Sequence, residues 1–366
     1  MTQPKLKIRE LRKTYGPVVA LGSASIEMPE GEFLTLLGPS GSGKTTMLMM
    51  IAGLVQPDSG EVWIDGKLAT YAPPYKRDIG VVFQNYALFP HLTVFENIAF
   101  PLRMRGTPDA ELRREVKRVL ELIQLADVGG RLPRALSGGQ QQRIALARCI
   151  VYRPSIILMD EPLGALDKKL RDQMKLEIKR LHEELGITVV YVTHDQEEAM
   201  IMSDRICLMN NARIEQIGTP SDLYFKPKTT FAADFLGESN LLDASVGGID
   251  GGDINLVTAA GTRLKAAQDP ERSFQKGQAV KVMVRPEMIS VLNNGAAAEN
   301  VIEGRVTDSI LVGGVTKYYA RLADGTEVSA TDLTRGPMAP LARDSVIRFG
   351  WPKESAVLLP LGEDAA

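Results

Sequence analysis

The stretch G-P-S-G-S-G-K-T, from Gly38 to Thr45, decides the fold class. It follows the apolar run Phe33–Leu37, which predicts a buried strand, and it precedes a segment that predicts a helix from Thr45 to about Ile51. The spacing G-x-x-x-x-G-K-[ST] is matched without a gap, and its glycines allow successive backbone N–H groups to curl around a phosphate. The positive N-terminal end of the following helix would point at the same anion. Strand, loop and helix together predict a phosphate-binding loop in an α/β protein.

Two residues of this loop carry chemistry of their own. The Lys44 ammonium is expected to reach the β- and γ-phosphates of a nucleoside triphosphate, and the Thr45 hydroxyl is expected to bind Mg²⁺. The alternative interpretation is a glycine-rich turn that binds no phosphate. The predicted strand before the loop and the predicted helix after it favour the phosphate loop. The other residues expected to surround the phosphates are Gly38, Pro39, Ser40, Gly41, Ser42, Gly43 and Thr46.

Further apolar runs predict the rest of an α/β unit. Three more buried strands are expected, at Ile79–Phe83, Ile156–Met159 and Thr188–Val192. Their continuous apolar character fits strands that are covered on both faces, and hence a mostly parallel sheet.

Two long helices follow from apolar residues at helical spacing. One is expected from about Pro108 to Leu125, with Thr107 as its N-cap and Pro108 in the first helical position. The other is expected from about Lys168 to Leu185 and would end at Gly186. His182 is expected on the solvated side of this second helix.

Polar residues follow three of the predicted strands. In I-I-L-M-D-E the strand ends in two carboxylates, and we expect Asp160 to bind Mg²⁺ and Glu161 to orient an attacking water. His194, after V-V-Y-V-T, could contact the γ-phosphate and the water, and the Gln84 amide could bind Mg²⁺ or water. Taken alone, each has an ordinary alternative: a solvated acidic turn, a hydrogen-bonded loop histidine, or a surface glutamine. Beside a phosphate loop the catalytic interpretation is favoured.

The stretch A-L-S-G-G-Q-Q-Q-R begins another predicted helix. Ser137 and Gln140 form a capping-box pattern, and an apolar helical run follows. Gly138 and Gly139 fall in the first turn, where each costs about 1 kcal/mol relative to alanine. The two glycines therefore predict that something approaches this backbone closely.

Composition limits the remaining possibilities. The chain has 366 residues and a net charge of −2, so it lacks the basic character of a nucleic-acid binder. The first residues lack the apolar core of a signal peptide, and no apolar run approaches the roughly 20 residues needed to span a bilayer. Cys149 and Cys207 both lie in apolar runs and are expected to be buried free thiols.

The character of the sequence changes near residue 237. From there on the predicted strands are short and the turns are frequent, for example at Ile249–Gly252, Asn293–Gly295 and Ala323–Gly325. This pattern predicts a small all-β domain, a barrel or sandwich. Tyr318–Arg321 and Thr326–Ser329 are expected to pair as a hairpin within it.

In their order, these motifs resemble the nucleotide-binding subunit of ABC transporters. The phosphate loop is followed by a Q-loop at Gln84, the signature L-S-G-G-Q, the Walker B strand ending at Asp160, a D-loop at Ala165–Asp167 and a switch histidine at His194. Tyr15 matches the aromatic residue that stacks on adenine, although a lone tyrosine is more often a core residue. The sequence departs from many relatives at Gly164, where they have serine, and this puts one D-loop contact in doubt.

The resemblance implies a fold and a domain organisation. Residues 1–236 would form a P-loop NTPase (RecA-like) ABC cassette, with a helical subdomain at about 85–135 that carries the signature. Residues 237–366 resemble the OB-like extension called TOBE that is found on importer ATPases, with a regulatory or dimerisation role.

The resemblance also implies an activity and partners. ATP and Mg²⁺ would be bound, and hydrolysis would power transport. Two subunits would pair head to tail, so that Ser137, Gly138, Gly139 and Gln140, together with Asp167, meet the ATP held by the partner's phosphate loop. Two permease subunits and an extracytoplasmic solute-binding protein would complete the complex on the cytoplasmic face of the membrane, and no nucleic-acid partner is expected.

The transported solute cannot be derived from motifs that contact only ATP. The stretch from Pro73 to Arg103, with F-L-G-E-S-N from Phe235, is most similar to spermidine/putrescine importer ATPases. Importers of sugar, ferric iron or phosphonate are the alternatives, and a soluble ABC ATPase that acts on nucleic acid is a remoter one.

Overall fold

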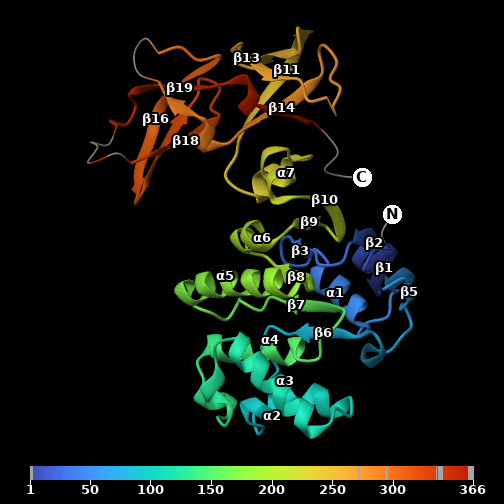
Figure 1. The fold of residues 1–366 in the computed structure, drawn as a ribbon. Helices are drawn as coiled ribbons and strands as arrows, with labels where there is room; N and C mark the ends of the chain where they lie inside the picture. Colours follow the sequence, from blue (N-terminus) through green and yellow to red (C-terminus); the bar gives the residue numbers. More distant parts are fainter. Residues whose placement is uncertain (1–2, 271, 293–295, 335, 337–340, 362–366) are drawn as a thin grey trace. The chain divides into compact units, whose positions relative to one another are not determined.

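The computed structural model describes residues 3–270, 272–292, 296–334, 336 and 341–361 (Figure 1). The chain divides into two compact units, residues 1–220 and residues 221–366. The boundary predicted at 236/237 lies after two short helices, α7 (Pro220–Phe225) and α8 (Thr230–Phe235), most of whose residues this division places in the second unit. Among the described residues, no helix has the length and apolar character that crossing a membrane requires.

A six-stranded sheet forms the centre of the first unit. Its order is β10 (Arg213–Gly218), β9 (Arg205–Asn210), β3 (Phe33–Leu37), β8 (Thr188–Thr193), β7 (Ile156–Asp160) and β6 (Ile79–Val82). All neighbouring strands are parallel except β10, which runs antiparallel to β9 at the edge. The prediction of a mostly parallel sheet of buried strands is confirmed.

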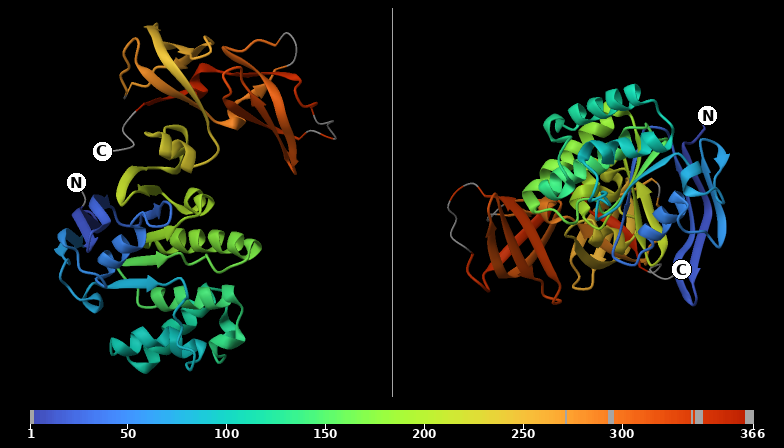
Figure 2. Two further views of the ribbon diagram at one scale, coloured as in Figure 1. Left: turned by 180° about the vertical axis from the view of Figure 1, so that it is seen from behind. Right: turned by 90° about the horizontal axis from the view of Figure 1, so that it is seen from below.

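The helices of the first unit are α1 (Lys44–Ala52), α2 (Val94–Met104), α3 (Asp109–Leu122), α4 (Gly138–Ile150), α5 (Lys168–Leu185) and α6 (Gln196–Met202). Side chains cap α2, α4, α5 and α6, at Thr93, Ser137, Asp167 and Asp195. Figure 2 shows α2, α3 and α4 gathered beside the central sheet. They share an apolar core that includes Val94, Ile98, Val116 and Ile144, and α4 lies beyond the segment of about 85–135 that was predicted as a helical subdomain.

The prediction for α3 was wrong at both ends. Pro108 has extended backbone torsions (φ −60°, ψ 143°) and is itself the N-cap, which moves the cap one residue beyond Thr107. The helix ends at Leu122 rather than Leu125 because Gln124 takes a φ of 58°, in the left-handed region.

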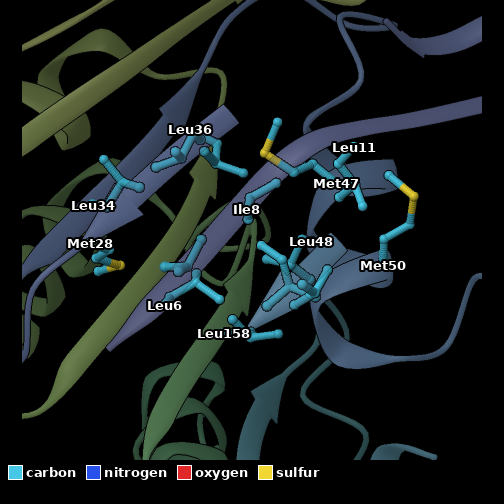
Figure 3. Packing of buried hydrophobic residues seen from close by; sticks show 14 of the residues in the cluster. Leu6, Ile8, Leu11, Met28, Leu34, Leu36, Met47, Leu48, Met50 and Leu158 are labelled. Carbon is cyan, nitrogen blue, oxygen red and sulfur yellow. The ribbon is translucent and has the colours of Figure 1, made fainter. Parts of the chain in front are cut away.

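An antiparallel sheet that the sequence analysis missed lies against the phosphate-loop helix. Its order is β2 (Val18–Met28), β1 (Leu6–Tyr15), β4 (Ser59–Ile64) and β5 (Lys67–Leu68). Leu6 and Ile8 of β1 pack with Met47 and Leu48 of α1, in one apolar cluster that also takes in residues of β3 and β7, such as Leu158 (Figure 3). The helix that follows the phosphate loop is therefore buried between two sheets.

The second unit contains two five-stranded antiparallel sheets. Their orders are β13-β12-β11-β14-β20 and β15-β19-β16-β17-β18. The strands are β11 (Asn240–Asp250), β12 (Asp253–Thr258), β13 (Arg263–Ala267), β14 (Ala279–Val284), β15 (Ser290–Val291), β16 (Asn300–Val312), β17 (Val315–Arg321), β18 (Glu327–Leu333), β19 (Val346–Trp351) and β20 (Val357–Pro360).

From Asn240 onward this unit is built mainly of β-strands, as the sequence predicted. The expected hairpin is present as β17 and β18, with Arg321 opposite Glu327. The turn expected at Asn293–Gly295 lies outside the described residues. One apolar cluster, which includes Phe349 and Trp351, joins residues from both sheets.

Candidate nucleotide-binding site

Two glycines of the phosphate loop are required by the packing of the loop itself. Gly38 and Gly43 have φ values of 156° and 97°, and a Cβ would lie 2.2 Å from Met209 O at Gly38 and 2.6 Å from Ala20 O at Gly43. Any side chain at these positions would collide with backbone that cannot move away cheaply. Gly41, with φ 81° and no atom within 4 Å of a built Cβ, bends the loop where its surroundings are open.

The Lys44 ammonium lies inside this loop. Its Nζ donates hydrogen bonds to Gly38 O at 2.8 Å and Pro39 O at 2.9 Å, and the residue is only 5% exposed. Burial lowers the pKa of Lys44, whereas the carboxylates of Glu161 and Asp160 act in the opposite direction. A cation is therefore held at the centre of the loop that was predicted to surround phosphates.

Thr45 and Asp160 meet beside this cation. The Thr45 hydroxyl donates to Asp160 Oδ1 at 3.1 Å, which joins the first turn of α1 to the end of β7. Burial is the main reason that the pKa of Asp160 is raised, and the Glu161 carboxylate raises it further, while Thr45 and Lys44 act to lower it.

This arrangement fits Mg²⁺ bound together with a nucleotide. Mg²⁺ is usually held by one or two carboxylates and the phosphates of its substrate, not by a cage of protein ligands. Within the described ranges, no group of three or more His, Cys, Asp and Glu side chains could hold a metal without such help. The Thr45 hydroxyl and the Asp160 carboxylate, two of the three metal ligands predicted from the sequence, therefore lie together beside the loop, and the contact that the structure gives the third, Gln84, is described below.

Glu161 and His194 contact each other just after the ends of the neighbouring strands β7 and β8. His194 Nδ1 lies 3.3 Å from Glu161 Oε1, and the Glu161 N–H donates to Val192 O at 3.0 Å. Glu161 has a φ of 44°, which a residue other than glycine rarely adopts. Such strained residues cluster at functional sites, where the surrounding structure holds them in place.

Gln84 lies next to the predicted D-loop. Its Nε2 is 3.7 Å from the position that a Cβ at Gly164 would take. A serine at position 164, as many relatives have, would place its Cβ in contact with Gln84. Glycine at this position removes that contact.

The backbone after Gln84 depends on a residue that the sequence analysis missed. Tyr86 and Ala87 both have positive φ, and Arg148 on α4 donates to the carbonyl oxygens of Ala87 (2.7 Å) and Tyr86 (3.0 Å). A single arginine after the signature gives no pattern from which this contact could be predicted.

Within the part of the chain that the structure describes, the signature residues bond to one another and make no hydrogen bond to the phosphate loop. The predicted capping box is confirmed: Ser137 Oγ accepts from Gln140 N–H at 3.4 Å, and Gln140 Oε1 accepts from Ser137 N–H at 3.1 Å. Asp167 likewise caps a helix, because its Oδ1 accepts from Leu170 N–H at 3.0 Å.

The two signature glycines have different surroundings. A Cβ on buried Gly139 would lie 2.8 Å from Leu170 Cδ1, so the end of the Leu170 side chain would have to shift to admit it. Gly138 is exposed, and a Cβ would meet only Leu166 Cδ2 at 3.3 Å. Close approach from outside the chain is thus a better explanation for Gly138 than for Gly139.

Gly138→Ala separates folding from function. Alanine in the first helical turn should leave the free energy of unfolding unchanged or raise it by up to about 1 kcal/mol. If a phosphate approaches the backbone amides of this turn, the added methyl group should hold it away from them. ATP turnover should then fall by about tenfold or more, since weakening one charge-assisted hydrogen bond has an effect of this size. Urea unfolding and steady-state phosphate release would measure the two effects. Gly130→Ala, with no atom within 4 Å of its Cβ, is the control, and unchanged turnover in Gly138→Ala would contradict the interpretation.

Tyr15 lies at the end of β1 with its ring accessible. The residue is 52% exposed, and the Lys13 ammonium lies 5.4 Å from the ring centroid. Lys13 and the Thr14 backbone are both held by Asp58, at 2.8 and 2.7 Å. The core alternative is excluded for this tyrosine, and its ring is free to stack on a planar ligand.

Comparison with known proteins agrees with these observations. Residues 21–164 match the ABC transporter family, and residues 282–359 match the TOBE domain. The chain is 44% identical over 354 residues to the "Spermidine/putrescine import ATP-binding protein PotA" of Rubrobacter xylanophilus, covering 97% of this chain and 93% of that protein. It is 44% identical over 364 residues to the protein of the same name from Thermobifida fusca, covering 98% and 94%.

Solved structures are similar to the first unit. The chain is similar to cbiO1 of Clostridium perfringens, part of the ABC transporter complex cbiONQ, with a TM-score of 0.57 and 28% identity over 61% of this chain and 91% of that one. It is similar to the dimeric ATP-binding cassette MJ0796, bound to ADP and Pi in a post-hydrolysis state, with a TM-score of 0.53 and 38% identity over 59% and 98%. The chain therefore belongs to the ABC transporter family, as an ATP-hydrolysing subunit with a C-terminal TOBE domain.

Proposed function

We propose that this subunit powers the import of a polyamine such as spermidine or putrescine. The observation that carries the proposal is similarity over the whole chain, TOBE domain included, to relatives that are named as spermidine/putrescine import ATP-binding proteins. Importers of sugar, ferric iron or phosphonate are the alternatives. A role on nucleic acid is remoter, since the net charge is −2.

The proposed complex contains two copies of this chain, two permease subunits and an extracytoplasmic solute-binding protein, on the cytoplasmic face of the membrane. Exposed Gly138 at the start of α4 supports a head-to-tail dimer, because among the described residues no hydrogen bond joins this helix N-terminus to the phosphate loop of the same chain. The dimeric relative MJ0796 also supports it. We further propose the limits 1–236 for the cassette and 237–366 for the TOBE domain.

The site residues have separate roles in this proposal. When bound, ATP with Mg²⁺ supplies the γ-phosphoryl group that is transferred to water. Lys44 would exchange its bonds to the loop carbonyls for bonds to the phosphates, and Thr45 and Asp160 would hold the metal. Tyr15 would stack on the base, and Gln84 would bind the metal or the water.

Glu161 and His194, which follow β7 and β8, would act on the attacking water and the phosphate. Glu161 would accept a hydrogen bond from the water and orient it in line with the phosphate. His194, 3.3 Å from Glu161, would hold that carboxylate and bind the departing phosphate. Ser137, Gly138, Gly139, Gln140 and Asp167 would act on the ATP of the partner subunit.

The test is purification of the native complex from membranes, followed by ATPase assays in liposomes with its solute-binding protein. We expect permease subunits to co-purify and spermidine or putrescine to raise turnover several-fold. Maltose, ferric iron and a phosphonate serve as the alternative solutes. Stimulation by one of these would replace the polyamine, and stimulation by DNA or RNA without membrane partners would overturn the importer.

A further inference from the structure

His194 depends on its neighbours in the chain for its position. Its side chain is 60% exposed, and the contact that orients its ring is Glu161 Oε1 at 3.3 Å. An exposed ring has little packing around it, so whether it reaches Glu161 depends on the position of the backbone on both sides. On one side, Thr193 Oγ1 donates to the buried carboxylate of Glu198 at 2.7 Å and accepts from Asp195 N–H at 3.0 Å.

On the other side of the histidine, both carboxylate oxygens of Asp195 are in use. Asp195 Oδ1 accepts from Glu198 N–H at 3.1 Å and so caps α6. Asp195 Oδ2 lies 3.5 Å from Nη1 of Arg171, which belongs to the first turn of α5.

Arg171 joins this side of His194 to the predicted D-loop. Its Nη2 donates to Leu166 O at 3.1 Å, within the segment Ala165–Asp167. Its Nε is buried and has no hydrogen-bond partner among the described residues, which costs free energy. The contacts with Leu166 O and Asp195 Oδ2 must offset the cost of the unpaired Nε. These two contacts therefore hold the guanidinium in place.

The same turn of α5 also contacts the signature helix. Leu170, next to Arg171, occupies the space where a Cβ of Gly139 would lie, 2.8 Å from its Cδ1. Residues 167–171 thus contact the signature, the D-loop and the segment that carries His194.

We infer that Arg171 is a positioning residue that couples His194 to the D-loop, within a turn of α5 whose Leu170 also contacts the signature helix. The guanidinium transmits a displacement of Leu166 to Asp195, and hence to the backbone beside His194. The inference rests on the proposed role of His194 in ATP hydrolysis.

The first test is Arg171→Met, which keeps the apolar stem of the side chain and removes the charge. We expect kcat to fall about tenfold, while KM for ATP stays within about twofold, because coupling between contacting residues is of this size. The control is Arg180→Met on the same helix: like Arg171, Arg180 donates to a backbone carbonyl, Leu122 O, and it pairs with the carboxylates of Glu177 and Glu184. Turnover in the control should be unchanged.

Asp195→Asn completes a double-mutant cycle. Asparagine can still cap α6 but cannot pair with the guanidinium. We expect the double variant Arg171→Met/Asp195→Asn to lose no more turnover than the worse single variant. Losses that multiply would show that the two residues act independently and would overturn the inference.

Hydrogen exchange gives a readout that does not depend on activity. Arg171→Met should speed deuterium uptake at the amides of residues 193–196, and Arg180→Met should not. Unchanged uptake there, or a loss confined to KM, would also overturn the inference. If the wild type and His194→Ala hydrolyse ATP equally well, the proposed role of His194 fails instead, and the exchange experiment still reports on the contact.

Discussion

Lys44→Met should lower kcat/KM for ATP hydrolysis by about 10³-fold or more. The substitution removes the buried cation at the centre of the phosphate loop, and charge-assisted hydrogen bonds contribute about 1.5–3 kcal/mol each to binding. A further loss arises in the transition state, where a positioned donor contributes about 10²–10³-fold to kcat. Fluorescent-nucleotide titration and phosphate release would measure the two parts.

The control for Lys44 is Lys5→Met. Lys5 is a half-buried lysine of the same unit whose ammonium pairs with Glu30 and Asp65. Its loss should change stability more than turnover, with kcat/KM within about threefold of the wild type. Tight nucleotide binding by Lys44→Met would refute the assignment of the phosphate loop.

Glu161→Gln should lower kcat by about 10²–10⁴-fold and leave ATP binding intact. A glutamine occupies the same place but cannot accept a proton from the attacking water, and general-base catalysis contributes an effect of this size. Because hydrolysis is what would separate the subunits, the variant should accumulate as an ATP-bound dimer. Size-exclusion chromatography with and without ATP would detect it.

The matched variant for Glu161 is Glu115→Gln on α3. Glu115 is a carboxylate of similar exposure that pairs with Arg118 and Arg153. It should neither lower turnover nor cause dimers to accumulate. Wild-type turnover in Glu161→Gln would show that another group activates the water.

The sequence predicted the elements whose signals are local. The strand Phe33–Leu37 and the helix Lys168–Leu185 were predicted with the bounds that the structure has. The helix has an Asp167 cap at one end and Gly186 with φ 60° at the other, so both limits are written in neighbouring residues. The two cysteines are buried and free, as their apolar surroundings indicated.

Features that depend on distant contacts were missed. The sheet of β1, β2, β4 and β5 alternates buried and exposed residues irregularly, with register shifts along β1, so its period was not recognised. His182 was predicted to be solvated and is not: its Nε2 lies 3.0 Å from Gly31 O, and its ring packs edge-on against Phe33. Helical periodicity cannot reveal a partner 151 residues away.

The candidate site divides in the same way. The predicted site residues lie at or just after the carboxyl ends of buried strands, and the carboxyl ends of parallel strands lie along one edge of a sheet. They are Lys44, Thr45, Asp160, Glu161 and His194. Arg148 and Arg171 act through backbone carbonyl groups, which accept hydrogen bonds whatever the side chain is. No spacing of residue types could therefore predict these two contacts.

The burial of α1 between two sheets has a consequence for the thermodynamics of nucleotide capture. A phosphate loop that begins such a helix, and whose Gly38 and Gly43 are pressed against Met209 and Ala20, has lost most of its conformational freedom when the chain folds. Binding an anion therefore costs little further conformational entropy of the loop. The free energy of the new contacts raises affinity because it is not needed to order the loop. The receptor for the phosphates is preorganised by a core that never touches them.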